Sequence, residues 1–181
     1  MSYFTKIIHG SIIYLKNGSV KPIDEVDIGD ELVSYIPSDL KISHQDIELI
    51  KDKNNKISHS TDDFPAKGKF VSNKVKSIDI IRENVEFIKI NENINNSNSE
   101  DITRLEKQTK IYTNRGWVSI IDENPLKISD CYLNWKNRWK VIYEITNSAE
   151  IDDSIFNVEN SIWKIETEND NIVLESFIIK Q

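Results

Sequence analysis

The side chains that most often do chemistry are scarce in this sequence. Among 181 residues it holds one cysteine, Cys131, and three histidines, His9, His44 and His59. A single cysteine can form neither an intramolecular disulfide nor a cysteine-based zinc site. Cys131 lies in an expected strand, and no histidine follows it to act as a base, so a buried structural thiol is favoured over a nucleophile.

The histidines do not indicate a metal site. His44 and His59 lie in a polar stretch that also holds aspartates, but a metal ion needs three or four converging ligands. His9 could act as a base or a pH-sensitive contact, but an ordinary residue at a strand end is the favoured interpretation. The five glycines are too few to form a nucleotide-binding loop beside their turns. We expect no metal and no cofactor.

The segment from Asn134 to Lys140 has the most unusual composition, since two tryptophans alternate with three cations in an acidic chain. Aromatic and arginine side chains supply much of the binding energy at protein interfaces, so Trp135, Arg138 and Trp139 are candidate partner contacts. The same pattern could stack on single-stranded nucleic acid. A strand whose tryptophans fill the core while the cations face solvent is a third interpretation.

Short runs of β-branched and aromatic residues between turn residues predict an all-β fold. The expected strands are 11–15, 20–23, 31–36, 69–81, 85–90, 102–105, 110–113, 117–121, 131–133, 139–145, 161–167 and 172–179. Strands 69–81 and 85–90 are expected to form the longest hairpin, and 161–167 and 172–179 the last one. The polar segment Pro37–Gly68 is interpreted as an insertion or elaborated loop, with one short strand near 47–50. We find no internal repeat in the sequence.

Charge and length exclude several classes of function. The chain has 23 Lys and Arg against 30 Asp and Glu, a net charge of −7. Because affinity for phosphate is largely electrostatic, an acidic chain is a poor general binder of nucleic acid. No stretch approaches the ~20 apolar residues that cross a bilayer, and residues 1–10 lack the features of a signal peptide. We expect one domain over residues 1–181 that binds neither nucleic acid nor membrane.

The order of signals along the chain resembles a Hint domain, the fold of inteins and of the Hedgehog autoprocessing module. Its opening is matched by Gly10-Ser11, the Asn17-Gly18 turn and Ile28-Gly29-Asp30. Later matches are Lys110–Val118, Leu126–Leu133 with Ser129 in place of a glycine, and the closing segment Ile162–Gln181. Phe87–Asn91 resembles part of the Hint modules embedded in virion proteins of tailed bacteriophages.

The resemblance also implies where catalytic residues would stand, and each position holds a different residue type. The nucleophile position falls on Lys6, whose amine could attack a carbonyl only to form a dead-end amide. The Thr-x-x-His pair falls on Glu106 and Thr109, and the terminal His-Asn pair on Lys180 and Gln181. Gln181 could cyclise in principle. With only five residues before Lys6 and none after Gln181, we expect nothing to be released.

These replacements predict a protein that is not an enzyme. The resemblance implies a structural component of a virus particle, a tail or baseplate protein of a tailed bacteriophage, assembled in the host cytoplasm and bound to other virion proteins. One alternative is an active self-processing intein or Hint domain. Another is a cellular protein-binding module without any connection to a virus.

Overall fold

A computed structural model describes residues 2–38, 45, 48, 68–83, 86–91, 102–135, 139–142, 144–147 and 160–181. It is all-β, as the sequence predicted, with one short 3-10 turn, η1 (Ile23–Glu25). The strands are β1 (Tyr3–Ile8), β2 (Ile12–Tyr14), β3 (Val20–Pro22), β4 (Glu31–Ile36), β5 (Lys69–Glu83), β6 (Phe87–Asn91), β7 (Ile102–Glu106), β8 (Lys110–Thr113), β9 (Gly116–Val118), β10 (Cys131–Leu133), β11 (Trp139–Val141), β12 (Glu144–Asn147), β13 (Asn160–Thr167), β14 (Asn171–Leu174) and β15 (Phe177–Lys180). Most of the expected insertion 37–68 lies outside the described residues. Of its expected strand near 47–50 only Glu48 is described, and its backbone is helical, which does not support a strand there.

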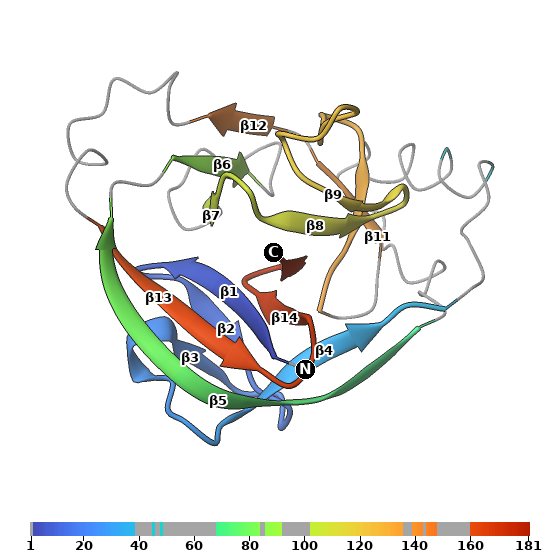
Figure 1. Cartoon of the computed structure of the whole chain (residues 1–181). Helices are drawn as coiled ribbons and strands as arrows, with labels where there is room; N and C mark the ends of the chain where they lie inside the picture. Colours follow the sequence, from blue (N-terminus) through green and yellow to red (C-terminus); the bar gives the residue numbers. More distant parts are fainter. Residues whose placement is uncertain are drawn as a thin grey trace.

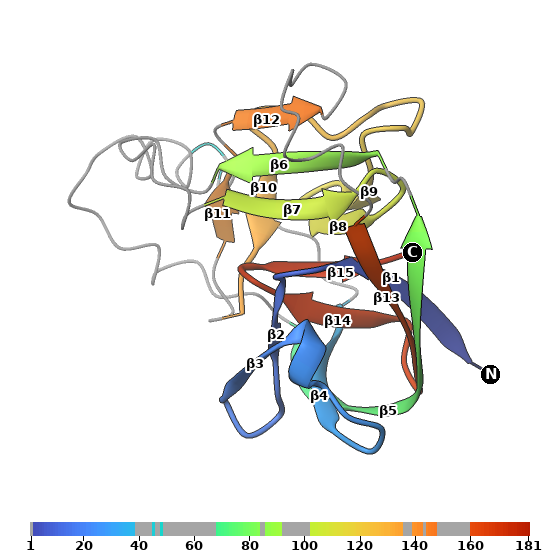
Figure 2. The ribbon, with the colours of Figure 1, turned by 90° about the vertical axis from the view of Figure 1, so that its left-hand side faces the viewer.

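The described residues form three antiparallel sheets (Figure 1). One has the strand order β1-β13-β5-β4, and a larger one runs β11-β10-β8-β15-β14-β2-β3 with β9 paired to β8. The third has the order β12-β6-β7, and Figure 2 shows these strands stacked above β1 and β15. The largest core cluster takes isoleucines from all three sheets, among them Ile7, Ile90 and Ile172, each at most 1% exposed.

Strand β5 is unusually long and pairs with two different strands along its length. Its first half, Lys69–Lys74, pairs with β4, and the rest, from Val75 to Glu83, pairs with β13. Figure 1 shows β5 and β13 curving side by side along one edge of the molecule. β13 therefore lies between β1, near the start of the chain, and β5.

The prediction of two long hairpins from the sequence is wrong. Strands 69–81 and 85–90 do not pair with each other: β5 pairs with β4 and β13, whereas β6 pairs with β7 and β12. In β6, Phe87, Ile88 and Ile90 are all buried. A strand that is apolar on both faces needs more cover than a two-stranded hairpin provides.

The expected single strand 172–179 is a hairpin of its own, β14 and β15. The chain reverses at Glu175, which takes a positive φ of 53°. β14 pairs with β15 and β2, so it is not the partner of β13. A strand of the first sheet, β1, was not expected from the sequence at all; its residues pair with β13 from Tyr3 to Ile8.

The turns that lead into β4 and β10 have the same local geometry. Asp30 Oδ2 accepts the N–H of Asp27 at 2.9 Å, and Asp130 Oδ2 accepts the N–H of Lys127 at 3.0 Å. The residue before each aspartate has a positive φ, 93° at Gly29 and 76° at Ser129. Ser129 thus adopts the backbone conformation of the glycine that it replaces in the Hint pattern.

The equivalence extends to the cations around these turns. Lys21 Nζ lies 2.9 Å from Asp30 Oδ2. Arg115 donates hydrogen bonds to both carboxylate oxygens of Asp130, from Nε to Oδ1 at 3.0 Å and from Nη2 to Oδ2 at 2.8 Å. The structure therefore contains a repeat that the sequence does not reveal, because the two turns share few residues besides the aspartate.

Candidate functional site

Three of the five positions implied by the resemblance come together in the structure. Glu106 ends β7, Thr109 immediately precedes β8, and Gln181 follows β15. The pairing of β15 with β8 sets Lys180 opposite Lys110 and Ile179 opposite Ile111. This register carries Gln181 to the turn between β7 and β8.

The carboxamide of Gln181 makes two hydrogen bonds in this cluster. Its Nε2 donates to Glu106 Oε2 at 3.0 Å and to Thr109 Oγ1 at 3.3 Å. Glu106 also accepts the backbone N–H of Gln108 at 3.2 Å, and its main-chain oxygen accepts the N–H of Thr109 at 2.9 Å. Glu106 and Thr109 are buried, at 9% and 1% exposed. We call Glu106, Thr109 and Gln181 the terminal cluster.

The chemistry open to the terminal cluster is narrow. A carboxylate can accept a proton from the amide and a hydroxyl can donate a hydrogen bond. Self-processing also needs a group that protonates the departing amine near neutral pH, for which histidine is the usual choice. Thr109 stands where that histidine is expected and cannot serve as such an acid.

Lys6 is the fourth position. It lies in the middle of β1 with its backbone paired to Lys164 of β13. The flanking residues Thr5 and Ile7 are 1% exposed, whereas Lys6 is half-buried. Side chains alternate along a strand, so Lys6 projects from the face opposite Thr5 and Ile7.

Lys180, the fifth position, turns away from the terminal cluster. Its Nζ lies 3.4 Å from Asp170 Oδ2 and 4.7 Å from the centre of the Trp117 ring. Successive side chains of a strand point to opposite faces, which sends Gln181 and Lys180 to different neighbours.

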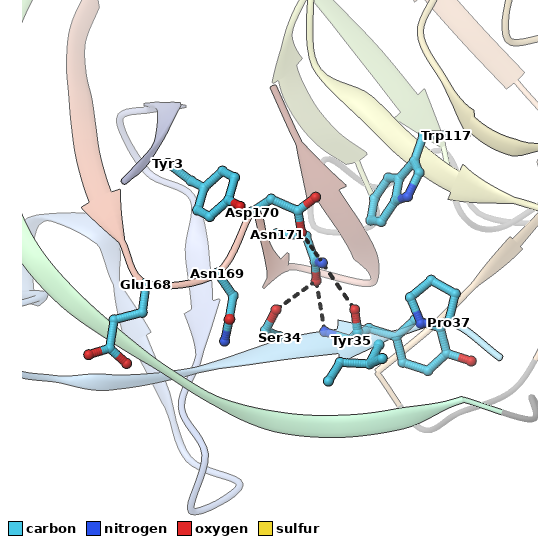
Figure 3. Close-up of a pocket in the computed structure, with 10 residues that line it drawn as sticks. Tyr3, Ser34, Tyr35, Pro37, Trp117, Glu168, Asn169, Asp170 and Asn171 are labelled. Atoms are coloured by element: carbon cyan, nitrogen blue, oxygen red, sulfur yellow. Dashed lines mark hydrogen bonds between the residues drawn. The ribbon is translucent and has the colours of Figure 1, made fainter. Parts of the chain in front are cut away.

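Beside Lys180 is a pocket of about 310 Å³ (Figure 3). It is lined by Tyr3, the segment 34–37 at the end of β4, Trp117 of β9 and the turn 168–171 between β13 and β14. Figure 3 shows Tyr3 and Trp117 on opposite sides, with Asp170 and Asn171 between them. This pocket could not be predicted from the sequence, because its walls come from four segments that are far apart along the chain.

Asn171 holds the base of the pocket together. Its Oδ1 accepts the N–H of Tyr35 at 2.7 Å and the hydroxyl of Ser34 at 3.1 Å, and its Nδ2 donates to the Tyr35 carbonyl at 3.0 Å. Burial raises the pKa of the Tyr35 phenol to about 12. The Tyr35 hydroxyl also accepts the N–H of Gly68 at 2.9 Å. The base is therefore a polar frame in which hydrogen bonds join Asn171 to the end of β4.

The residues of the aromatic segment expected to contact a partner have different environments in the structure. Trp139 is 6% exposed and packs in a core cluster, with its ring 6.0 Å from that of Tyr112. Trp135 is 38% exposed and stacks on Tyr14 at 4.8 Å. Arg138 lies outside the described residues. Of the two tryptophans in this segment, Trp135 alone presents much surface to a partner, and its role as a contact stays a prediction.

The cysteine and histidines show no sign of a catalytic arrangement among the described residues. Cys131 is fully buried in a core cluster, and His9 is exposed with its ring stacked on Trp163 at 5.3 Å. His44 and His59 lie outside the described residues. Within the described part of the chain, no three acidic, histidine or cysteine side chains gather as a metal site would require. Nor does that part contain a helix long and apolar enough to span a membrane.

Neither a protein-family model nor a curated protein matches this sequence. Solved structures do match the fold. A bacterial intein-like domain from Clostridium thermocellum is 11% identical, with a TM-score of 0.59 over 98% of this chain and 99% of that one. The DnaX mini intein of Spirulina platensis is 14% identical, with a TM-score of 0.55 over 97% and 99%. A DnaB intein from Synechocystis is 14% identical, with a TM-score of 0.54 over 97% and 98%.

At these identities the likeness is one of fold, and it agrees with the motif order found in the sequence. The all-β architecture matches across almost the entire length of both partners in each comparison. The chain thus has an intein-like, or Hint, fold.

Proposed function

We propose that this chain is a non-enzymatic structural component of a larger assembly, built on a Hint fold without its self-processing reaction. The resemblance to phage-embedded Hint modules makes the tail or baseplate of a tailed bacteriophage the proposed assembly. The proposal includes binding to other virion proteins and a location in the virion after assembly in the host cytoplasm.

The terminal cluster carries this proposal. Both N–H groups of the Gln181 carboxamide have acceptors, in Glu106 and Thr109, so the amide is used as a structural link. Lys6 offers no thiol or hydroxyl for the first step. With thirty acidic against 23 basic residues, contact with protein is favoured over contact with nucleic acid.

One observation favours the alternative of an active self-processing domain. Glu106 Oε2 is 3.0 Å from the amide nitrogen that would attack the Gln181 carbonyl, and a carboxylate there could accept its proton. That ring closure would form a six-membered imide, and the leaving amine would still need a proton donor. Thr109 is too weak an acid for this role.

Mass spectrometry of the full chain separates these alternatives. We expect the purified 21.0 kDa chain to keep its mass during several days with a thiol at neutral pH. A second sample carries a short peptide after Gln181, with Gln181→Ala as its matched control. Release of that peptide from the parent alone, or cleavage at Lys6, contradicts the proposal.

The proposed location has its own test. We expect peptides of this chain in tail or baseplate fractions of purified phage particles, at a constant ratio to the other proteins there. Detection in host cells but not in particles would favour a cellular protein-binding module and overturn the virion assignment.

A further inference from the structure

The pocket beside β15 already shows which kind of group it can hold. Lys180 reaches its edge and places an ammonium 4.7 Å above the centre of the Trp117 ring and 3.4 Å from Asp170 Oδ2. Trp117 and Asp170 both line the pocket, whereas Lys180 is not part of its lining. An aromatic face and a carboxylate together form a recognition site for a cation.

Lys180 fills this position loosely. A strong ammonium–carboxylate hydrogen bond is about 2.7–2.9 Å long, shorter than the 3.4 Å found here. The side chains of Lys180 and Asp170 are 23% and 41% exposed, so water screens their attraction. Asp170 is positioned by another bond, since its Oδ1 accepts Asn171 Nδ2 at 2.8 Å. The carboxylate is therefore fixed while its cation is exchangeable.

The rest of the pocket suits a longer cationic side chain. Ile36, Pro37 and Tyr3 also line the pocket and add apolar surface for an aliphatic stem. A guanidinium fits this set better than an ammonium, because it is planar, stacks on aromatic rings and can bind a carboxylate through two parallel hydrogen bonds. The volume of about 310 Å³ is in the range of known ligand sites.

We propose that this pocket binds an arginine side chain of a partner protein, which displaces Lys180 from Trp117 and Asp170. The inference rests on the proposed function in one respect, namely that the chain acts by binding proteins. It assigns Trp117 and Asp170 as the residues that recognise the partner, and Lys180 as an internal competitor for them.

Titration of the isotope-labelled full chain with N-acetyl-arginine amide, followed by NMR, tests the proposal. We expect saturable shifts of the Trp117 indole and of the Asp170 and Asn171 amides. N-acetyl-glutamine amide, which has similar polarity without the charge, should leave these signals in place. Equal shifts with both probes, or none at Trp117 with arginine, would overturn the assignment.

Two variants should change the affinity in opposite directions. Lys180→Met removes the competitor and should tighten binding about two- to fivefold, while Asp170→Asn should weaken it about tenfold. Lys164→Met is the matched control, since Lys164 makes a similar contact with the Phe4 ring at 4.8 Å on another sheet. No tightening in Lys180→Met contradicts the displacement. Because the probe is a small molecule, this result is independent of the mass tests of self-processing.

Discussion

Gln181 and Glu106 are 75 residues apart in sequence, yet the carboxamide Nε2 of one lies 3.0 Å from Oε2 of the other. This hydrogen bond joins the end of β15 to the turn between β7 and β8, where the Hint resemblance places catalytic residues. Three positions to which the Hint resemblance assigns catalytic residues thus lie together and are joined by hydrogen bonds.

Removal of that link should cost stability. Gln181→Ala should lower the free energy of unfolding by about 1 kcal/mol, because Glu106 and Thr109 each lose a donor. Urea denaturation followed by tryptophan fluorescence measures the change. Gln108→Ala is the control, since Gln108 contacts Glu106 through its backbone N–H alone among the bonds found here. Equal losses in both variants would deny the Gln181 side chain its structural role.

The two aspartate turns should differ in their dependence on the cation. Arg115→Met should cost about 2–3 kcal/mol, because Asp130 is 4% exposed and would lose both of its charged hydrogen bonds. Lys21→Met should cost clearly less, since Lys21 and Asp30 are 30% and 22% exposed. Thermal and urea unfolding of the two variants give the comparison. A larger loss for Lys21→Met would contradict the role assigned to burial.

The same pair of turns predicts opposite effects of glycine. Ser129→Gly should stabilise the protein by about 0.5–1 kcal/mol, because serine at a φ of 76° is strained and glycine is not. Gly29→Ser should destabilise it by about 1 kcal/mol. Space is not the cause, since a Cβ at Gly29 would meet nothing within 4 Å. Unfolding curves with effects of the same sign in both variants would refute the backbone explanation.

Alkali should destabilise the protein through Tyr35. Burial raises the pKa of this phenol to about 12, whereas an unfolded tyrosine ionises near 10. Below pH 10 both states hold the proton. Between pH 10 and 12 the unfolded chain releases it first, so about 2–3 kcal/mol of stability is lost as the pH rises.

Tyr35→Phe isolates this effect, because the other tyrosines remain. In urea unfolding experiments, the free energy of unfolding of the parent minus that of the variant should fall from pH 9 to pH 12. A difference that stays constant over that range would show that the Tyr35 phenol ionises alike in both states.

Strand positions could be predicted where turn residues bounded them. The strands expected at 31–36, 110–113 and 131–133 have the same bounds as β4, β8 and β10. Partners were harder to predict, because alternation specifies which residues are buried and not which strand covers them. β6 and β13 look like hairpin partners of β5 and β14, but both bury residues on two faces. β6 instead pairs with β7 and β12, and β13 with β1 and β5.

In the candidate site, too, some features could be predicted and others could not. The motif order placed Glu106, Thr109 and Gln181 at equivalent catalytic positions, and the structure brings these three together. The contacts of Lys180 with Trp117 and Asp170 could not be predicted, since they depend on how β9 and the turn 168–171 approach the end of β15. Spacing along the chain carries no information about that approach.

The central place of β13 has a consequence for synthesis. It inserts between β1 and β5, and β14 likewise inserts between β2 and β15. The early strands β1 and β2 therefore stay without these partners until the last part of the chain has been synthesised. Neither sheet can close until residues 160–180 have left the ribosome, and loops of such length close slowly. We therefore expect β1 and the second half of β5 to stay accessible to chaperones or to other chains until those residues have emerged.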